Sequence, residues 1–502
     1  MECGRRPRVV GSFFEVSDLL KGWLGAVAGV ALVFSSTAFG DDAPHARIST
    51  GELAGVRQAG VAAFLGIPFA APPVGNLRWR PPQPPTAWKG VRAAGRFGAN
   101  CLQAVDPAGF GPWKHEYVVQ DAVSEDCLFL NVWTPAQTGA HRPVLVWIHG
   151  GAFTSGSGSV PIYNGAALAS RGVVVVTINY RVGIWGFLAH PDLSREAAGA
   201  PPSNFGLQDM LAALRWVQGN IAAFGGDPKH VTIAGQSAGS MAVHDLLVSP
   251  LAKGLFAQAI SESGLPTSLP IRSLGEAQAA GEAFAHFVGA TNIASLRAMS
   301  AAKIEAGAPK TGLGPVVDGV LLPDDPMELI AENRFNDTPV LIGLNADEGS
   351  FHPNYGPKEA AQLREGGLGA VYFWARARQA HSHQPIYAYF DTYVEPGAES
   401  ARYGAFHSSE IPYVFGTLDT APERGFTPKD VAHSKEMAAY WVSFVAHGDP
   451  NGEQRPSWPK LDAGHPEIME LGTAAHAIPL LSPEKLQAQE ELMANGGSLQ
   501  MF

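Results

Sequence analysis

The segment Val231-Thr232-Ile233-Ala234-Gly235-Gln236-Ser237-Ala238-Gly239 has the pattern of two kinds of structure joined across one short turn. It begins as a β-branched apolar run and ends in a G-x-S-x-G pattern, and apolar residues at helical spacing follow from Met241 to Val248. A serine between two glycines at a strand-to-helix turn is typical of a strained nucleophile held at the top of a sheet. The stretch therefore predicts a strand, a tight turn and a helix, with Ser237 as the nucleophile.

Other short apolar runs resemble the strand that precedes Ser237. They are rich in β-branched residues, which is typical of strands buried on both faces, as in a parallel sheet. These runs are Leu128–Trp133, Val144–Ile148, Val173–Ile178, Pro339–Asn345 and Pro385–Phe390. Helical stretches such as Gly206–Phe224 lie between them, and residues 270–335 are predicted to be mainly helical.

Strands that alternate with helices predict the α/β class, with a large, mostly parallel central sheet flanked by helices. The chain contains no long flexible linker, so we expect residues 41–502 to form a single catalytic domain with helical and loop insertions.

A glycine-rich loop, His149-Gly150-Gly151-Ala152-Phe153, follows the predicted strand Val144–Ile148. Such a loop donates backbone N–H groups to an oxyanion, together with the N–H of the residue after the nucleophile. The pattern predicts an oxyanion hole made by Gly151, Ala152 and Ala238. The alternative is that the two glycines merely form a turn at the end of a strand.

A serine is a poor nucleophile alone and needs a base, which a third group must orient. On this kind of turn the partners follow in the order serine, acid, histidine along the chain. Several histidines lie after Ser237, so the order alone does not choose among them.

The N-terminal segment has the composition of a secretory signal. Arginines at positions 5, 6 and 8 precede an apolar run from Trp23 to Phe34, and small residues follow up to Gly40. This pattern predicts a signal peptide over residues 1–40 and a secreted or periplasmic protein without stable membrane insertion after cleavage. An uncleaved anchor is the alternative, although the run is short for a membrane span.

The charge and the cysteines bear on partners and compartment. A net charge of −11 disfavours nucleic acid as a partner, because phosphates repel an acidic surface. Cys101 and Cys127 remain after signal removal, and export permits a disulfide between them. Two separate buried thiols are the alternative.

Further motifs run in order through almost the whole chain after the signal. They are Gly66-Ile67-Pro68-Phe69-Ala70, Leu77-Arg78-Trp79, Glu125-Asp126-Cys127-Leu128-Phe129-Leu130-Asn131, Asn179-Tyr180-Arg181, Gly186-Phe187-Leu188, Asn204-Phe205-Gly206-Leu207 and Phe224-Gly225-Gly226-Asp227-Pro228. With the glycine-rich loop and the serine turn, they resemble the type B carboxylesterase family, which includes cholinesterases and bacterial esterases.

The resemblance implies the α/β-hydrolase fold and the remaining site residues. The family's acid is a glutamate in a D-E-G segment, which here implies Glu348 rather than its neighbour Asp347. The family's histidine lies in an H-x-x-E segment, which here implies His407. The family also bridges the cysteines that correspond to Cys101 and Cys127. The implied reaction is hydrolysis of a small-molecule carboxylic ester through an acyl-enzyme, without a cofactor or metal.

Two features depart from the family or leave choices open. Gln236 stands where many members have Glu, so a negative charge beside the nucleophile is missing and choline esters are disfavoured. The resemblance places Tyr117 roughly where relatives have an aromatic platform, but we interpret Tyr117 and Trp113 as packing residues. One competing function is a catalytically silent adhesion protein of the same fold, but the presence of Ser237, Glu348 and His407 argues against it. The other is an enzyme of this fold with lipase or amidase specificity.

Overall fold

The computed structural model describes residues 43–135, 141–268, 270–499 and 501. The predicted signal peptide lies outside the described residues. A mixed sheet of eleven strands crosses the described part of the chain, in the order β20-β19-β18-β17-β14-β13-β11-β12-β10-β4-β3. In chain order these strands are β3 (Val56–Gln58), β4 (Val61–Pro68), β10 (Phe129–Pro135), β11 (Arg142–Ile148), β12 (Val174–Ile178), β13 (Gly226–Gln236), β14 (Gln258–Glu262), β17 (Val340–Asn345), β18 (Ile386–Asp391), β19 (Glu467–Leu471) and β20 (Ala475–Pro479).

The centre of this sheet is parallel, from β12 through β11, β13, β14, β17 and β18 to β19, as predicted. Its two ends are antiparallel. The predicted strand at Leu128–Trp133 forms, as β10, but it runs antiparallel to both β12 and β4. An apolar run shows that both faces of a strand are covered, and it carries no information on strand direction.

The two faces of the sheet bury separate clusters of side chains. Along β11, Val144, Val146 and Ile148 pack on one face with residues of the helices α4, α5 and α10. Leu145 and Trp147 point to the other face, where they pack with residues of α1, α12 and α13. Alternating side chains of one strand thus enter opposite layers, which gives helix, sheet and helix in succession.

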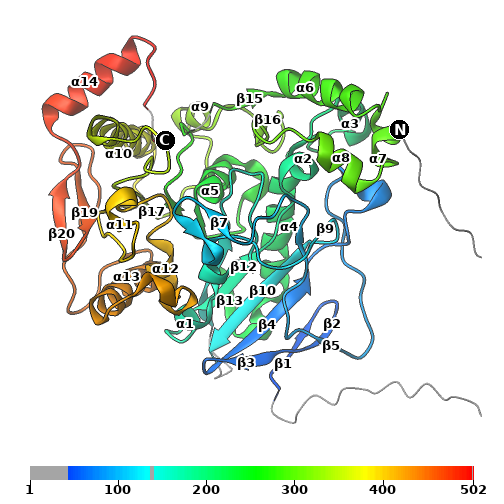
Figure 1. Ribbon diagram of the computed structural model, residues 1–502, viewed down its shortest axis with the longest axis horizontal. Coiled ribbons are helices and arrows are strands. Elements are labelled where there is room, and N and C mark those ends of the chain that lie inside the picture. Colours follow the sequence, from blue (N-terminus) through cyan, green and yellow to red (C-terminus); the bar gives the residue numbers. More distant parts are fainter. Residues whose placement is uncertain (1–42, 136–140, 269, 500, 502) are drawn as a thin grey trace, which may run out of the picture. The chain divides into compact units, whose positions relative to one another are not determined.

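The helices agree with the predicted α/β alternation (Figure 1). They are α1 (Ala166–Ala169), α2 (Gly183–Phe187), α3 (Pro191–Ala197), α4 (Phe205–Asn220), α5 (Ala238–Val248), α6 (Leu274–Phe287), α7 (Ile293–Arg297), α8 (Ala301–Gly307), α9 (Pro326–Ala331), α10 (Pro357–Gln379), α11 (Ser400–Tyr403), α12 (Ile411–Phe415), α13 (Pro428–His447) and α14 (Pro483–Ala494). The predicted helical region at 270–335 contains α6 to α9. Figure 1 shows α6, α7 and α8 on the side of the sheet opposite β20 and α14.

Further short strands lie outside the large sheet. They are β1 (His45–Ile48), β2 (Gly51–Ala54), β5 (Val91–Ala93), β6 (Asn100–Cys101), β7 (Gly109–Phe110), β8 (Trp113–Lys114), β9 (Val123–Ser124), β15 (Arg272–Ser273) and β16 (Val316–Val317). Strand β6 contains Cys101 and pairs with β9, and β7 pairs with β8 within the segment between Cys101 and Cys127. These two strand pairs fix the backbone path of the loop between the cysteines.

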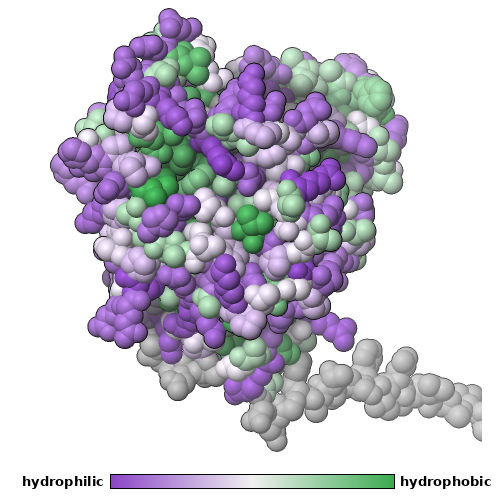
Figure 2. Space-filling view, turned by 60° about the vertical axis from the view of Figure 1, so that its left-hand side comes forward, coloured by the Kyte–Doolittle hydropathy of each residue, from purple (hydrophilic) through white to green (hydrophobic). Residues whose placement is uncertain are grey.

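Hydrophilic side chains cover much of the face seen in Figure 2, with apolar side chains in smaller groups among them. Among the described residues, none of the helices combines the length and the apolar character that a membrane crossing requires.

Candidate active site

The serine turn has the geometry that its sequence predicts. Strand β13 ends at Gln236 and α5 begins at Ala238, and Ser237 between them has φ 57° and ψ −125°. A non-glycine residue in this region of backbone space is strained, and such strain is common at functional sites. Gly239 allows the close approach of β11, because a Cβ atom there would lie 2.1 Å from the carbonyl oxygen of Ile148.

The predicted histidine and acid meet although 59 positions separate them. His407 precedes α12, and Glu348 follows β17. Nδ1 of His407 lies 2.5 Å from Oε2 of Glu348. The other carboxylate oxygen, Oε1, accepts hydrogen bonds from the hydroxyl of Ser263 at 2.5 Å and from the backbone N–H of Asn345 at 2.6 Å. Glu348 is therefore a buried acceptor that orients the imidazole.

Asp347 faces a different set of partners. Its carboxylate accepts hydrogen bonds from the hydroxyl of Tyr355 at 3.0 Å, the guanidinium of Arg364 at 2.7 Å and the backbone N–H of Ala405 at 3.0 Å. The two adjacent acids thus point in different directions. Asp347 ties the acid loop to the loop that carries His407, a structural contact that the sequence did not reveal.

Two other buried histidines have structural surroundings. His149 stacks on Tyr180 with ring centroids 4.2 Å apart, and burial lowers its pKa to about 4. His244 on α5 lies 2.9 Å from the hydroxyl of Ser261, and burial lowers its pKa to about 3. Neither imidazole lines the cavity onto which Ser237 opens, whereas that of His407 does.

Ser237 and His407 open onto one cavity of about 630 Å³. This volume falls in the range typical of sites for small molecules. The predicted oxyanion residues Gly151, Ala152 and Ala238 also line the cavity. The other wall is largely apolar and includes Phe110, Trp113, Tyr117, Val119, Val160, Met241 and Phe351. The structure thus brings the serine, the base and the predicted backbone donors to the same hollow.

Trp113 and Tyr117 pack against neighbouring side chains, as the sequence interpretation expected, and both also line the cavity. The indole N–H of Trp113 also donates to the backbone carbonyl of His407 at 2.9 Å. The loop between the cysteines therefore contacts the loop that carries His407 directly. Its position depends on tertiary contacts, which the loop sequence does not encode in a recognisable pattern.

Gln236 has a contact that sequence reasoning missed. Its side-chain nitrogen lies 3.1 Å from Nε2 of His407, and the side chain is buried. An amide nitrogen donates, so Nε2 accepts. The imidazole proton then stays on Nδ1, which donates a hydrogen bond to Glu348. This is the tautomer that a general base toward Ser237 requires.

Two further buried acids lie near the triad residues. Burial and the charge of Glu348 raise the pKa of Glu410 to about 7, although the amide of Asn345 donates to it at 2.5 Å. Burial also raises the pKa of Glu262, whose carboxylate accepts from the indole of Trp441 at 2.7 Å. Glu410 is the glutamate of the H-x-x-E segment, so this motif could have identified it as a residue near the site. Glu262 had no such signal.

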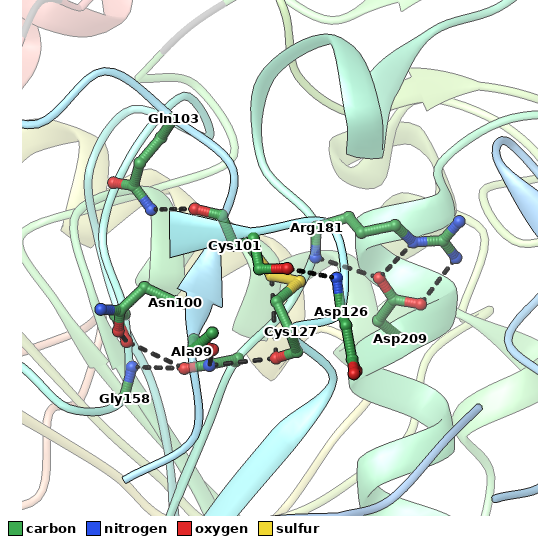
Figure 3. Close-up of a disulfide and its surroundings, with 12 residues drawn as sticks. Ala99, Asn100, Cys101, Gln103, Asp126, Cys127, Gly158, Arg181 and Asp209 are labelled. Carbon is green, nitrogen blue, oxygen red and sulfur yellow. Dashed lines mark hydrogen bonds and ion pairs between the residues drawn. A yellow bond between two sulfur atoms is a disulfide. The ribbon is translucent and has the colours of Figure 1, made fainter. Parts of the chain in front are cut away.

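The two cysteines lie side by side, with Gln103 close to Cys101 (Figure 3). Their Cα atoms are 4.8 Å apart, a separation that a disulfide spans. Gln103, two residues after Cys101, hydrogen-bonds Gly156 through both its amide atoms, at 2.7 and 2.9 Å. Gln103 thus ties the segment after Cys101 to the loop at Gly156, and both residues line the cavity.

Comparison with known proteins agrees with this geometry. The carboxylesterase family model matches residues 42–366 and 368–490. The chain is 39% identical over 478 residues to fumonisin B1 esterase of Sphingopyxis macrogoltabida, which covers 84% of this chain and 85% of that protein. It is 34% identical over 499 residues to para-nitrobenzyl esterase of Bacillus subtilis strain 168, which covers 89% of this chain and 98% of that protein.

Solved structures give the same result. A para-nitrobenzyl (PNB) esterase superposes with a TM-score of 0.77 at 31% identity, covering 88% of this chain and 98% of that one. A carboxylesterase of Geobacillus stearothermophilus superposes with a TM-score of 0.74 at 35% identity, covering 88% and 99%. The predicted α/β-hydrolase fold is confirmed. The chain belongs to the carboxylesterase family and is a carboxylic-ester hydrolase.

Proposed function

We propose that the chain hydrolyses small carboxylic esters by two-step acyl transfer through an acyl-enzyme on Ser237. His407 takes the hydroxyl proton as Ser237 attacks the ester carbonyl, and it then protonates the leaving alcohol. Water repeats the sequence and releases the acid. Glu348 holds the imidazole in the required tautomer, and the backbone N–H groups of Gly151, Ala152 and Ala238 stabilise the oxyanion.

The observation that carries this mechanism is the meeting of three separate segments at one cavity. The strained turn at Ser237, the buried pair of His407 and Glu348, and the glycine-rich loop come from distant parts of the chain. Strand β11, which precedes the glycine-rich loop, is hydrogen-bonded in parallel to β13, which precedes Ser237. Adjacent parallel strands therefore present the nucleophile and the oxyanion donors at the same edge.

The cavity favours neutral esters with an apolar or aromatic group. Aromatic and aliphatic side chains form most of its outer wall, and Gln236 is neutral where it contacts His407. A cationic substrate would find no carboxylate at this position. The relatives named for para-nitrobenzyl and fumonisin esters are consistent with a family that accepts varied alcohols.

The test is a comparison of Ser237→Ala with Ser170→Ala. Ser170 is an exposed serine whose hydroxyl donates to the carbonyl of Ala167, so it controls for loss of a hydroxyl. With a para-nitrophenyl ester we expect Ser237→Ala to lose several orders of magnitude in kcat, with a residual acceleration of about 10³ over water. A fluorophosphonate probe should label the control and not the Ser237 variant. Near-normal hydrolysis by folded Ser237→Ala would refute the mechanism.

We also propose that the chain is exported, with residues 1–40 removed and Cys101 joined to Cys127. The charged, apolar and small-residue pattern of the N-terminus supports export, and the proximity of the two cysteines supports the bridge. Sequencing the N-terminus of protein recovered from the medium or periplasm tests the cleavage. A mature cytoplasmic protein that begins near Met1 would contradict the proposal.

A further inference from the structure

A group of metal-ligating side chains lies away from the triad, behind the cavity wall. His115 and Glu116 belong to the short 3-10 helix His115–Tyr117, and Glu423 belongs to a second one, Pro422–Arg424. Their ligand atoms all lie within 4.8 Å of one another, which sets this trio apart among the described residues. The two short helices are more than 300 positions apart in the chain, so tertiary folding assembles the group.

The distances suit a metal ion. Nδ1 of His115 lies 3.3 Å from Oε2 of Glu116 and 3.3 Å from Oε1 of Glu423. Both are longer than a good N–H···O hydrogen bond. Zinc binds histidine nitrogen and carboxylate oxygen at about 2.0–2.2 Å in a tetrahedral arrangement, which places neighbouring ligand atoms about 3.3–3.5 Å apart. The two imidazole–carboxylate distances thus match the spacing of ligands around one ion, and all three ligand atoms lie within 4.8 Å of one another.

Glu116 supplies an independent indication of a ligand. Its side chain is 1% exposed, and its Oε2 atom, which faces the imidazole, has no hydrogen-bond partner among the described residues. Its other oxygen accepts a hydrogen bond from the Nε–H of Arg424 at 2.6 Å. Leaving a buried carboxylate oxygen without a hydrogen bond is costly, and coordination of a cation would remove that cost.

The surrounding charge also favours a cation. The guanidinium of Arg424 forms ion pairs with two carboxyl groups, those of Glu116 and Glu395. Glu423 adds a third carboxyl group, which contacts His115. The side chains of His115 and Glu423 are 45% and 55% exposed, so an ion from solvent can reach them.

We propose that His115, Glu116 and Glu423 bind one Zn²⁺ ion, with water completing its coordination. Imidazole with two carboxylates suits zinc better than the oxygen-preferring ions Ca²⁺ and Mg²⁺. Arg424 positions Glu116 through its second oxygen, as partners behind metal ligands commonly do. The ion would tie the segment that carries Trp113 and Tyr117 to the loop before α13. It would therefore stiffen one wall of the cavity without contacting the reacting atoms.

The experiment measures Zn²⁺ binding to the untagged full chain after treatment with a chelator. Isothermal titration should give one equivalent of bound Zn²⁺, and the midpoint of thermal unfolding should rise when Zn²⁺ is added. His115→Ala and Glu423→Gln should each weaken the affinity by at least about tenfold and remove the thermal shift. Both residues are largely exposed, so the variants should fold.

His476→Ala is the matched control. Nε2 of His476 lies 3.4 Å from Oε2 of Glu470 in an exposed pair that has a single carboxylate. This variant should bind Zn²⁺ as the unchanged protein does. The proposal is overturned if the unchanged protein binds no Zn²⁺, or if His115→Ala and Glu423→Gln bind it as tightly as the control. The first result would mean that the trio is a surface ion-pair network, and the second that Zn²⁺ binds elsewhere.

Discussion

Replacing Glu348 with Gln should nearly abolish turnover, and the hydrogen bonds of the site show why. Oε1 of Glu348 accepts from the backbone N–H of Asn345, which can only donate. A glutamine at this position must therefore place its carbonyl oxygen there and turn its NH₂ group toward His407. The NH₂ group would then donate to Nδ1 of His407, so the imidazole proton would move to Nε2. Nε2 could no longer accept the proton of Ser237.

The size of the effect follows from this wrong tautomer. The matching substitution in the serine-protease triad lowers kcat by about 10⁴. At 1.36 kcal/mol per tenfold, this corresponds to about 5.4 kcal/mol of lost transition-state stabilisation. The fold should survive, because glutamine has nearly the same volume and keeps the hydrogen bond from Asn345.

Asp347→Asn is the matched comparison, since it neutralises the adjacent acid. Asp347 pairs with Arg364, whose side chain is 43% exposed, and such a pair is worth about 0–1 kcal/mol. We therefore expect this variant to keep most of its activity. The assay is kcat with a para-nitrophenyl ester at equal folded fraction, checked by circular dichroism. An inactive Asp347→Asn beside an active Glu348→Gln would refute the assignment of the acid.

Three further perturbations test other parts of the structure. Gln236→Glu places a carboxylate beside the imidazole of His407, and its negative charge favours the protonated ring. The acid limb of the pH profile of kcat/KM should therefore move to higher pH. An unchanged profile would contradict the contact between the two side chains. Burial raises the pKa of Asp245 to about 8, so the folded chain keeps a proton that the unfolded chain has released above about pH 4. The free energy of unfolding should thus fall as the pH rises from about 4 to 8. Measured by urea unfolding, the free energy of unfolding of Asp245→Asn should rise by up to about 4 kcal/mol relative to that of the unchanged protein between pH 5 and pH 8. The same pH dependence in both proteins would count against a buried proton on Asp245. Thiol titration of the exported protein under denaturing, non-reducing conditions should detect neither Cys101 nor Cys127 as a free thiol, and two free thiols would exclude the bridge.

Local patterns were sufficient for the elements whose signal is contained in a short stretch. The strand, turn and helix around Ser237 were predictable, because a β-branched run, two glycines and a helical apolar pattern each restrict the backbone locally. The strands β11, β12, β17 and β18 were predictable for the same reason. The choice of Glu348 and His407 needed motifs shared with a family, because nothing in their own neighbourhoods distinguishes them from other acids and histidines.

Tertiary structure decided what depends on contacts between distant segments. The antiparallel direction of β10 follows from its pairing with β4 and β12, since burial on both faces is the same for either direction. The contact of Trp113 with the backbone of His407 joins residues 294 positions apart. The approach of Glu423 to His115 joins residues 308 positions apart (423 − 115). The class of fold and the strand, turn and helix around Ser237 could be predicted because their signals are local. The cavity wall exists only after the sheet has brought separate loops to one edge.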